Sequence, residues 1–303
     1  MNLVRKIYLG AYRRIVLHSE YHKRQWGYVN KFWYIPSFNL DVVNLGSDSA
    51  LHAFEYSETN VKGMNWAVES QSLAYDYSVL KNYFSYLKPG ATVIITISPL
   101  SCLLTQITKE QNLKYYTCLH PATVQGFEEG EHIRALTLKR QNVLKAATVK
   151  TLCGVIGIWT KNIVRKMHTC NFKKDSANVI SMWKEQYGIA DFEKTLSNKH
   201  QKEQNEQAEL LCEMITFCIE RDLRPVLVFP PIHAELKNSL SASFFEHYVQ
   251  EFVNKANQSG VPFLNYLDDS ELQRNEYFYN SLFLNKTGGR LFTQKVLKDM
   301  KML

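Results

Sequence analysis

The stretch LDVVNLGSDSALHAFEY at residues 40–56 is the part of the chain from which the fold is predicted. Its first seven residues form a short apolar run rich in β-branched side chains that ends at Gly46, as buried parallel strands often do. The following SALHAFEY suits a helix. A strand that enters a helix through a glycine turn predicts a βα unit of an α/β protein.

Alternation of strands and helices continues along the chain. Apolar runs predict strands at residues 65–67, 92–98, 225–229 and 261–266, and amphipathic patterns predict helices at about 71–87, 200–221, 243–257 and from 286 onward. A stretch with purely helical or irregular periodicity, about 100–198, is predicted to be a helical insertion. This order of strands and helices predicts a flavodoxin-like three-layer α/β sandwich with about five parallel strands.

Composition favours a single domain. The chain has 303 residues, of which 45% are hydrophobic and 21% charged, close to globular averages. We therefore expect one domain over residues 1–303. Arg and Lys interrupt the apolar residues of the N-terminus, so no signal peptide is predicted, and no apolar run is long enough to span a bilayer. These features predict a cytoplasmic protein.

The net charge of +7 is concentrated in two stretches, residues 5–24 and 139–174. The N-terminal basic segment, 1–35, is compatible with a helix on the surface of an anionic membrane, but a solvated helix packed on the domain by its apolar side is favoured. The second stretch suits a helical cap, with phosphate or nucleic-acid binding as the alternative. Because no nucleic-acid motif accompanies the charge, no nucleic-acid partner is expected.

Cysteines and glycines argue against several site types. The six cysteines have no C-x-x-C spacing and no histidine at a metal-ligand distance, so we expect reduced thiols and no metal. Gly46 stands alone after the first strand, without a Walker A or G-x-G-x-x-G turn. No cofactor is therefore expected.

Ligands of such sheets gather at the carboxyl ends of the strands. Four loops lie there in the predicted fold, at residues 46–49, 98–101, 230–233 and 280–289. The glycine turn of the first loop resembles the first sequence block of SGNH (GDSL-like) hydrolases. The stretch YFYNSLFLNKTGGRLFTQKVL resembles their last block, with Leu284, Asn285 and Gly288 matching its L-N-x-x-G.

The resemblance implies that the catalytic triad of that family is replaced. It assigns Asn280 to the aspartate position and Phe283 to the histidine position, and in the first block it assigns Asp48 to the nucleophile position. A phenyl ring cannot accept a proton from serine, and an amide cannot stabilise an imidazolium as a carboxylate does. The central strand runs into Ser98 without the G-x-N-D block. A non-hydrolytic or atypical protein linked to bacterial surface polysaccharide is implied.

An active enzyme is the alternative, as a serine O-acyl esterase or O-acyltransferase acting on a glycan. Ser47 or Ser49 would be the nucleophile, His233 or His52 the base, with Asp48, Asp268 or Asp269 orienting it. Each of these residues also has an ordinary structural interpretation, the two serines as helix caps and the histidines as loop residues.

Pure binding is a third class. A pocket of Asp48, His233 and Asn280 would recognise the hydroxyls of a glycan or of an acylated small molecule, and an anion or sugar over the first helix N-terminus is a further option. The candidate binding residues are Gly46, Asn65, Ser98, Asn280 and Phe283.

Overall fold

The computed structural model describes residues 4, 26, 29–33, 38–104, 107–146 and 170–303. Most of the basic N-terminal segment expected at 1–35 lies outside these residues. Residues 147–169 of the second basic stretch lie wholly outside them. The contacts divide the chain into two compact units, residues 1–36 with 107–169 and residues 37–106 with 170–303. The expectation of one domain therefore stays a prediction.

The second unit contains a five-stranded parallel sheet in the order β2-β1-β3-β4-β5. This is the flavodoxin-like order, so the predicted fold class is confirmed. The strands are β1 Leu40–Leu45, β2 Gly63–Asn65, β3 Leu87–Thr96, β4 Arg224–Phe229 and β5 Phe263–Asn265.

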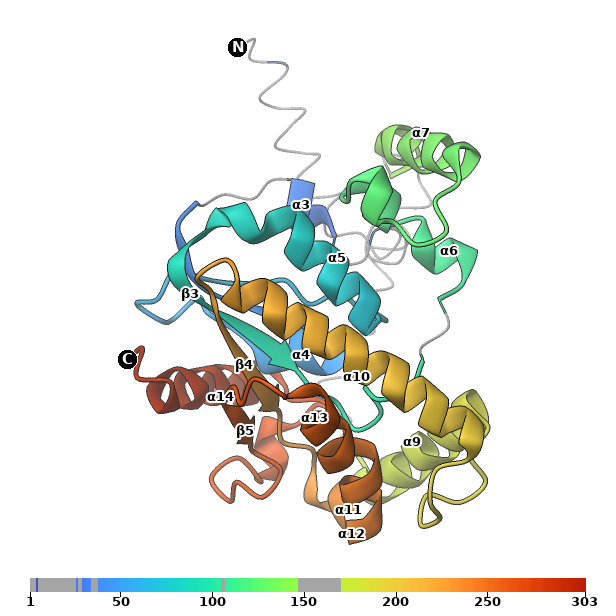
Figure 1. Ribbon diagram of the computed structural model, residues 1–303, viewed down its shortest axis with the longest axis vertical. Helices are drawn as coiled ribbons and strands as arrows, with labels where there is room; N and C mark the ends of the chain where they lie inside the picture. The colour runs from blue at the N-terminus through green and yellow to red at the C-terminus, as the bar shows by residue number, and fades with distance from the viewer. Residues whose placement is uncertain (1–3, 5–25, 27–28, 34–37, 105–106, 147–169) are drawn as a thin grey trace. The chain divides into compact units, whose positions relative to one another are not determined.

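Helices cover both faces of the sheet (Figure 1). On one face α4 Asp48–Ala53 packs against α14 Lys286–Asp299, and on the other α10 Asn198–Ile219 packs against α5 Leu73–Tyr83 and α13 Glu251–Ala256. The remaining segments of this unit are η2 Phe84–Tyr86, α9 Phe172–Tyr187, α11 Ala234–Asn238, α12 Ala242–Phe245, η5 Glu246–Gln250 and η6 Asn275–Tyr277.

The apolar core between the sheet and α14 explains why the strands are buried. Val42, Ile94 and Val228 come from three neighbouring strands, are fully buried, and belong to one apolar cluster with Phe292 and Val296 of α14. Each fully buried aliphatic or aromatic side chain contributes about 2 kcal/mol through the hydrophobic effect. Near-continuous apolar runs are therefore required of strands that are covered on both faces.

Three boundaries differ from the predicted ones. The central strand begins at Leu87 rather than at residue 92, because Lys88-Pro89-Gly90 lies within β3 instead of closing the preceding helix. The second strand is Gly63–Asn65, earlier than the predicted 65–67. The helix predicted at 243–257 is broken into α12, a π-helical turn η5 and α13.

The first unit is described in part, as short helical segments. These are α3 Asn30–Trp33, α6 Lys109–Asn112, η3 Tyr115–Thr117, η4 Pro121–Thr123 and α7 Glu129–Ala146. No helix in the described ranges is long and apolar enough to span a membrane. No disulfide joins any of the five cysteines that the structure describes in the two units.

Candidate functional site

The four loops at the carboxyl ends of the strands meet, as the sequence predicted. A small cavity of about 10 Å³ is lined by residues from all four: Ser49, Ile97, Ser98, Pro99, Phe229, Pro230, Pro231, Ile232, Leu282 and Leu284. A volume of this size holds at most one water molecule. No titratable side chain lines it, so the cavity offers no acid or base for chemistry.

The turn after β1 is held by a buried carboxyl group that the sequence analysis missed. Oδ1 of Asp76, in α5, accepts hydrogen bonds from the Gly46 backbone nitrogen at 2.6 Å and from Gln71 Nε2 at 2.5 Å. Burial raises the pKa of Asp76 to about 7, although both hydrogen bonds act in the opposite direction. The signal in the sequence was an aspartate among the apolar residues of a helix.

Gly46 is required at this turn. Its φ of +134° is rarely adopted by other residues, and a Cβ atom there would lie 2.7 Å from Ala50 Cβ and 3.0 Å from Thr96 Cβ. The glycine therefore lets α4 start close against the end of the central strand.

Ser47, Asp48 and Ser49 follow this turn at the start of α4. Ser47 occupies the N-cap position without a capping hydrogen bond, and its hydroxyl donates to Asp48 Oδ2 at 3.0 Å. The predicted capping role of Ser47 is therefore wrong. Asp48 Oδ2 also accepts from the Ser70 nitrogen at 2.9 Å. Ser49 lines the small cavity, and among the described residues no side chain accepts a hydrogen bond from its hydroxyl.

His52, one turn further along α4, lies between aromatic rings. Its ring stacks on Phe283 with centroids 5.2 Å apart and on Tyr279 with centroids 6.4 Å apart. We call Tyr279, His52 and Phe283 the aromatic cluster. Phe283, at the position that the family resemblance assigns to a catalytic base, therefore packs on a histidine contributed by another element.

His233 is a buried structural histidine in this fold. Its Nδ1 accepts from the Glu235 nitrogen at 3.1 Å, capping α11, and its Nε2 lies 2.8 Å from Asn275 Oδ1. Because the amide oxygen can only accept, the ring proton is assigned to Nε2. The ring also stacks on Phe172 with centroids 3.8 Å apart. Neither nitrogen is left to take a proton from Ser47 or Ser49.

The two aspartates considered as orienting groups are ion-paired elsewhere. Asp268 pairs with Lys237, and Asp269 lies 2.9 Å from Lys295 Nζ. None of Asp48, His233 and Asn280 lines the cavity at the strand ends. The pocket expected from these three residues stays a prediction.

The remaining candidate binding residues hold backbone in place. Asn280 Oδ1 accepts from the nitrogens of Leu282 and Phe283, shaping the last loop. Asn65 Nδ2 donates to three carbonyl oxygens at the end of α4, and Ser98 bonds Ser101 through its nitrogen and its hydroxyl. Their proposed role in binding stays a prediction.

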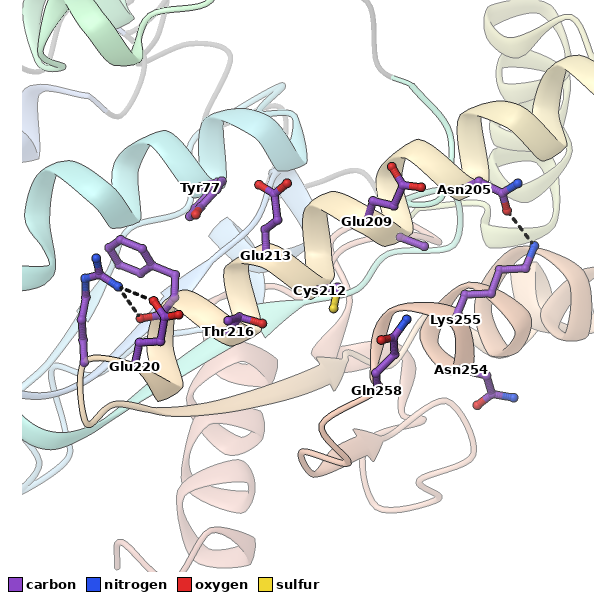
Figure 2. Close-up of a pocket in the computed structure, with 13 residues that line it drawn as sticks. Tyr77, Asn205, Glu209, Cys212, Glu213, Thr216, Glu220, Asn254, Lys255 and Gln258 are labelled. Atoms are coloured by element: carbon purple, nitrogen blue, oxygen red, sulfur yellow. Dashed lines mark hydrogen bonds and ion pairs between the residues drawn. The ribbon is translucent and has the colours of Figure 1, made fainter.

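A second hollow in the described part of the second unit lies away from these loops. It is an open groove of about 1160 Å³ along the outer face of α10, flanked by Tyr77 of α5 and by Lys255 of α13 (Figure 2). Lys255 donates hydrogen bonds to Gln204 and Asn205. Glu220 forms an ion pair with Arg221. The sequence analysis did not anticipate this groove.

No protein-family model matches this chain, and no curated protein matches it. Among solved structures it is similar to the chain described as "The structure of a putative platelet activating factor from Streptococcus pneumonia", at 12% identity and a TM-score of 0.42, with 99% of each chain covered. A similarity of this size says nothing about what this chain binds.

Proposed function

We propose that this chain is a non-hydrolytic protein of SGNH type that binds a glycan or an acylated sugar at the carboxyl edge of its sheet. The observation that carries the proposal is Phe283 at the position that the resemblance assigns to the catalytic base. The phenyl ring packs on His52 and cannot accept a proton.

The surroundings of the two serines support the loss of hydrolysis. Ser47 donates its hydroxyl to Asp48, and both ring nitrogens of His233 are engaged. An activated serine needs a base within about 3 Å of its hydroxyl. The cavity beside Ser49 is also too small for an ester group.

The aromatic cluster supports sugar binding. Tyr279 is 39% exposed, and its ring lies parallel to that of His52. Asp48 lies one turn before His52 on α4, and its carboxylate can accept hydrogen bonds. Sugar sites commonly combine an aromatic face with a few placed polar groups. A connection to bacterial surface polysaccharide rests on the family resemblance alone.

The test of the missing chemistry is intact-mass labelling with a fluorophosphonate probe. Wild type, Ser47→Ala and Ser49→Ala are compared, and we expect no adduct on any of them. A stoichiometric adduct that disappears in one variant would instead support the active O-acyl esterase or O-acyltransferase and would identify its nucleophile.

The test of binding uses an array of bacterial surface polysaccharide fragments. We expect Tyr279→Ala to reduce the signal by about tenfold, because the aromatic face against which a sugar would pack is lost. Phe38→Ala, which removes another exposed ring stacked on Tyr86, is the matched control and should leave the signal unchanged. No binding by wild type to any fragment would count against the proposal.

A further inference from the structure

The last loop of the second unit is a hairpin with a buried tip. Phe278 and Leu284 form an antiparallel bridge at its base, and the Tyr279 nitrogen donates to the Phe283 carbonyl oxygen at 2.9 Å. Ser281, at the tip, is fully buried. Buried backbone groups need hydrogen-bond partners, and at Ser281 other parts of the chain supply them.

Two separate elements hold this tip. Asp175 of α9 accepts hydrogen bonds at its Oδ2 atom from the nitrogen of Ser281, at 2.8 Å, and from its hydroxyl. The carbonyl oxygen of Ser281 accepts from the His233 nitrogen at 2.9 Å. The nitrogen, hydroxyl and carbonyl of Ser281 are therefore bonded outside the hairpin, the first two to a single carboxylate. Hydrogen bonds to a charged acceptor are stronger than those between neutral groups.

The start of α9 is itself held in place. Asp175 lies in the first turn of this helix, where the helix dipole favours a negative charge. Asn171 caps the helix by accepting from the Lys174 nitrogen at 3.1 Å. Phe172, also in the first turn, stacks on His233 with ring centroids 3.8 Å apart. The carboxylate of Asp175 is therefore a fixed anchor for the hairpin tip.

The hairpin carries two members of the aromatic cluster. Tyr279 and Phe283 lie two residues before and after the tip, a distance of about 7 Å along an extended strand. Both rings stack on His52 of α4, with planes inclined to that of His52 by 3° and 24°. Because the two rings are so close to the tip, a change in the position of Ser281 moves them relative to His52.

We propose that Asp175 is a positioning residue for the aromatic cluster. Its carboxylate fixes Ser281, and the hairpin then holds both of its rings against His52 before a ligand binds. A cluster that is already ordered binds more tightly than one that a ligand must order, because less conformational entropy is lost on binding. The effect of Asp175 on sugar binding rests on the proposed function, whereas its effect on the cluster does not.

Nuclear magnetic resonance of the full chain without ligand tests the positioning. The Hε1 resonance of His52, assigned from its loss in His52→Gln, is shifted by the ring currents of the two stacked rings. In Asp175→Ala we expect it to move toward its position in Phe283→Leu. Asp175→Asn keeps an oxygen that can accept both hydrogen bonds, so the resonance should stay at its wild-type position. Glu185→Ala, which removes an exposed carboxylate from the same helix, should also leave it unchanged.

Sugar binding is the second readout. On the array of bacterial surface polysaccharide fragments, Asp175→Ala should reduce the signal by about tenfold, and Asp175→Asn should bind as wild type. If wild type binds no fragment, the proposed function fails, and the resonance of His52 still decides the role of Asp175. An unchanged resonance in folded Asp175→Ala would overturn the proposal, as would unchanged binding of a fragment that wild type binds. If Asp175→Ala fails to fold, Ser281→Ala, which removes one of the two hydrogen bonds, takes its place.

Discussion

The backbone nitrogen of Gly46 donates a hydrogen bond of 2.6 Å to Oδ1 of Asp76, thirty residues later in the chain. This contact joins the turn after the first strand to a helix on the opposite face of the sheet from α14. Asp76 is only 4% exposed, so its carboxyl group bonds the turn and has little contact with water. The start of α4, and with it Ser47 and Asp48, depends on this buried group.

The pH dependence of stability should reveal Asp76. Its pKa is about 7 in the folded protein against an ordinary value of 3.8, so between these values the folded state binds more protons than the unfolded state. Stability should therefore fall as pH rises from about 4 to 7, by at most about 1.4 kcal/mol per pH unit, and this component should level off above pH 7.

Urea denaturation of wild type and Asp76→Asn across this pH range measures the effect. The variant lacks the titrating group, so its stability should decline less over the range. Parallel curves for the two proteins would show that Asp76 is not the group responsible.

Gly46→Ala should destabilise the protein by about 2–4 kcal/mol. The new Cβ atom would clash with Ala50 and Thr96, and alanine rarely adopts the φ of +134°. Gly260→Ala is the control, because Gly260 also has a positive φ, +65°, but no atom lies within 4 Å of the position that its Cβ would take. Denaturant midpoints should fall much further for Gly46→Ala, and equal losses would mean that crowding at the turn is unimportant.

Asp175→Ala should loosen the last loop. The carboxylate of Asp175, in α9, accepts hydrogen bonds from both the nitrogen and the hydroxyl of Ser281, which is fully buried. Its removal leaves buried donors unsatisfied, at a cost of about 2 kcal/mol or more. Amide hydrogen exchange over residues 280–284 should accelerate, whereas the exposed Glu185→Ala on the same helix should leave it unchanged. Unchanged exchange in both variants would refute this role.

Much of the fold could be predicted from short-range patterns. The apolar runs at 40–46 and 225–229 were recognised because strands covered on both faces must be apolar nearly throughout. The last helix was recognised from its glycine-containing start at Lys286 and from its apolar face. The helix at 243–257 was predicted as continuous, and its π-helical turn at Glu246–Gln250 was missed.

The sequence by itself determined which segments form strands and which residue types follow them, since apolar runs and turn chemistry are local properties. Only the tertiary structure decided what those residues do. Asp76, Phe172 and Asn275 are distant in sequence from the groups they contact. These contacts bury a carboxyl beneath Gly46, cover the ring of His233 and engage its Nε2. Hydrogen-bond partners and burial arise from packing between separate elements, which no local pattern of residues encodes.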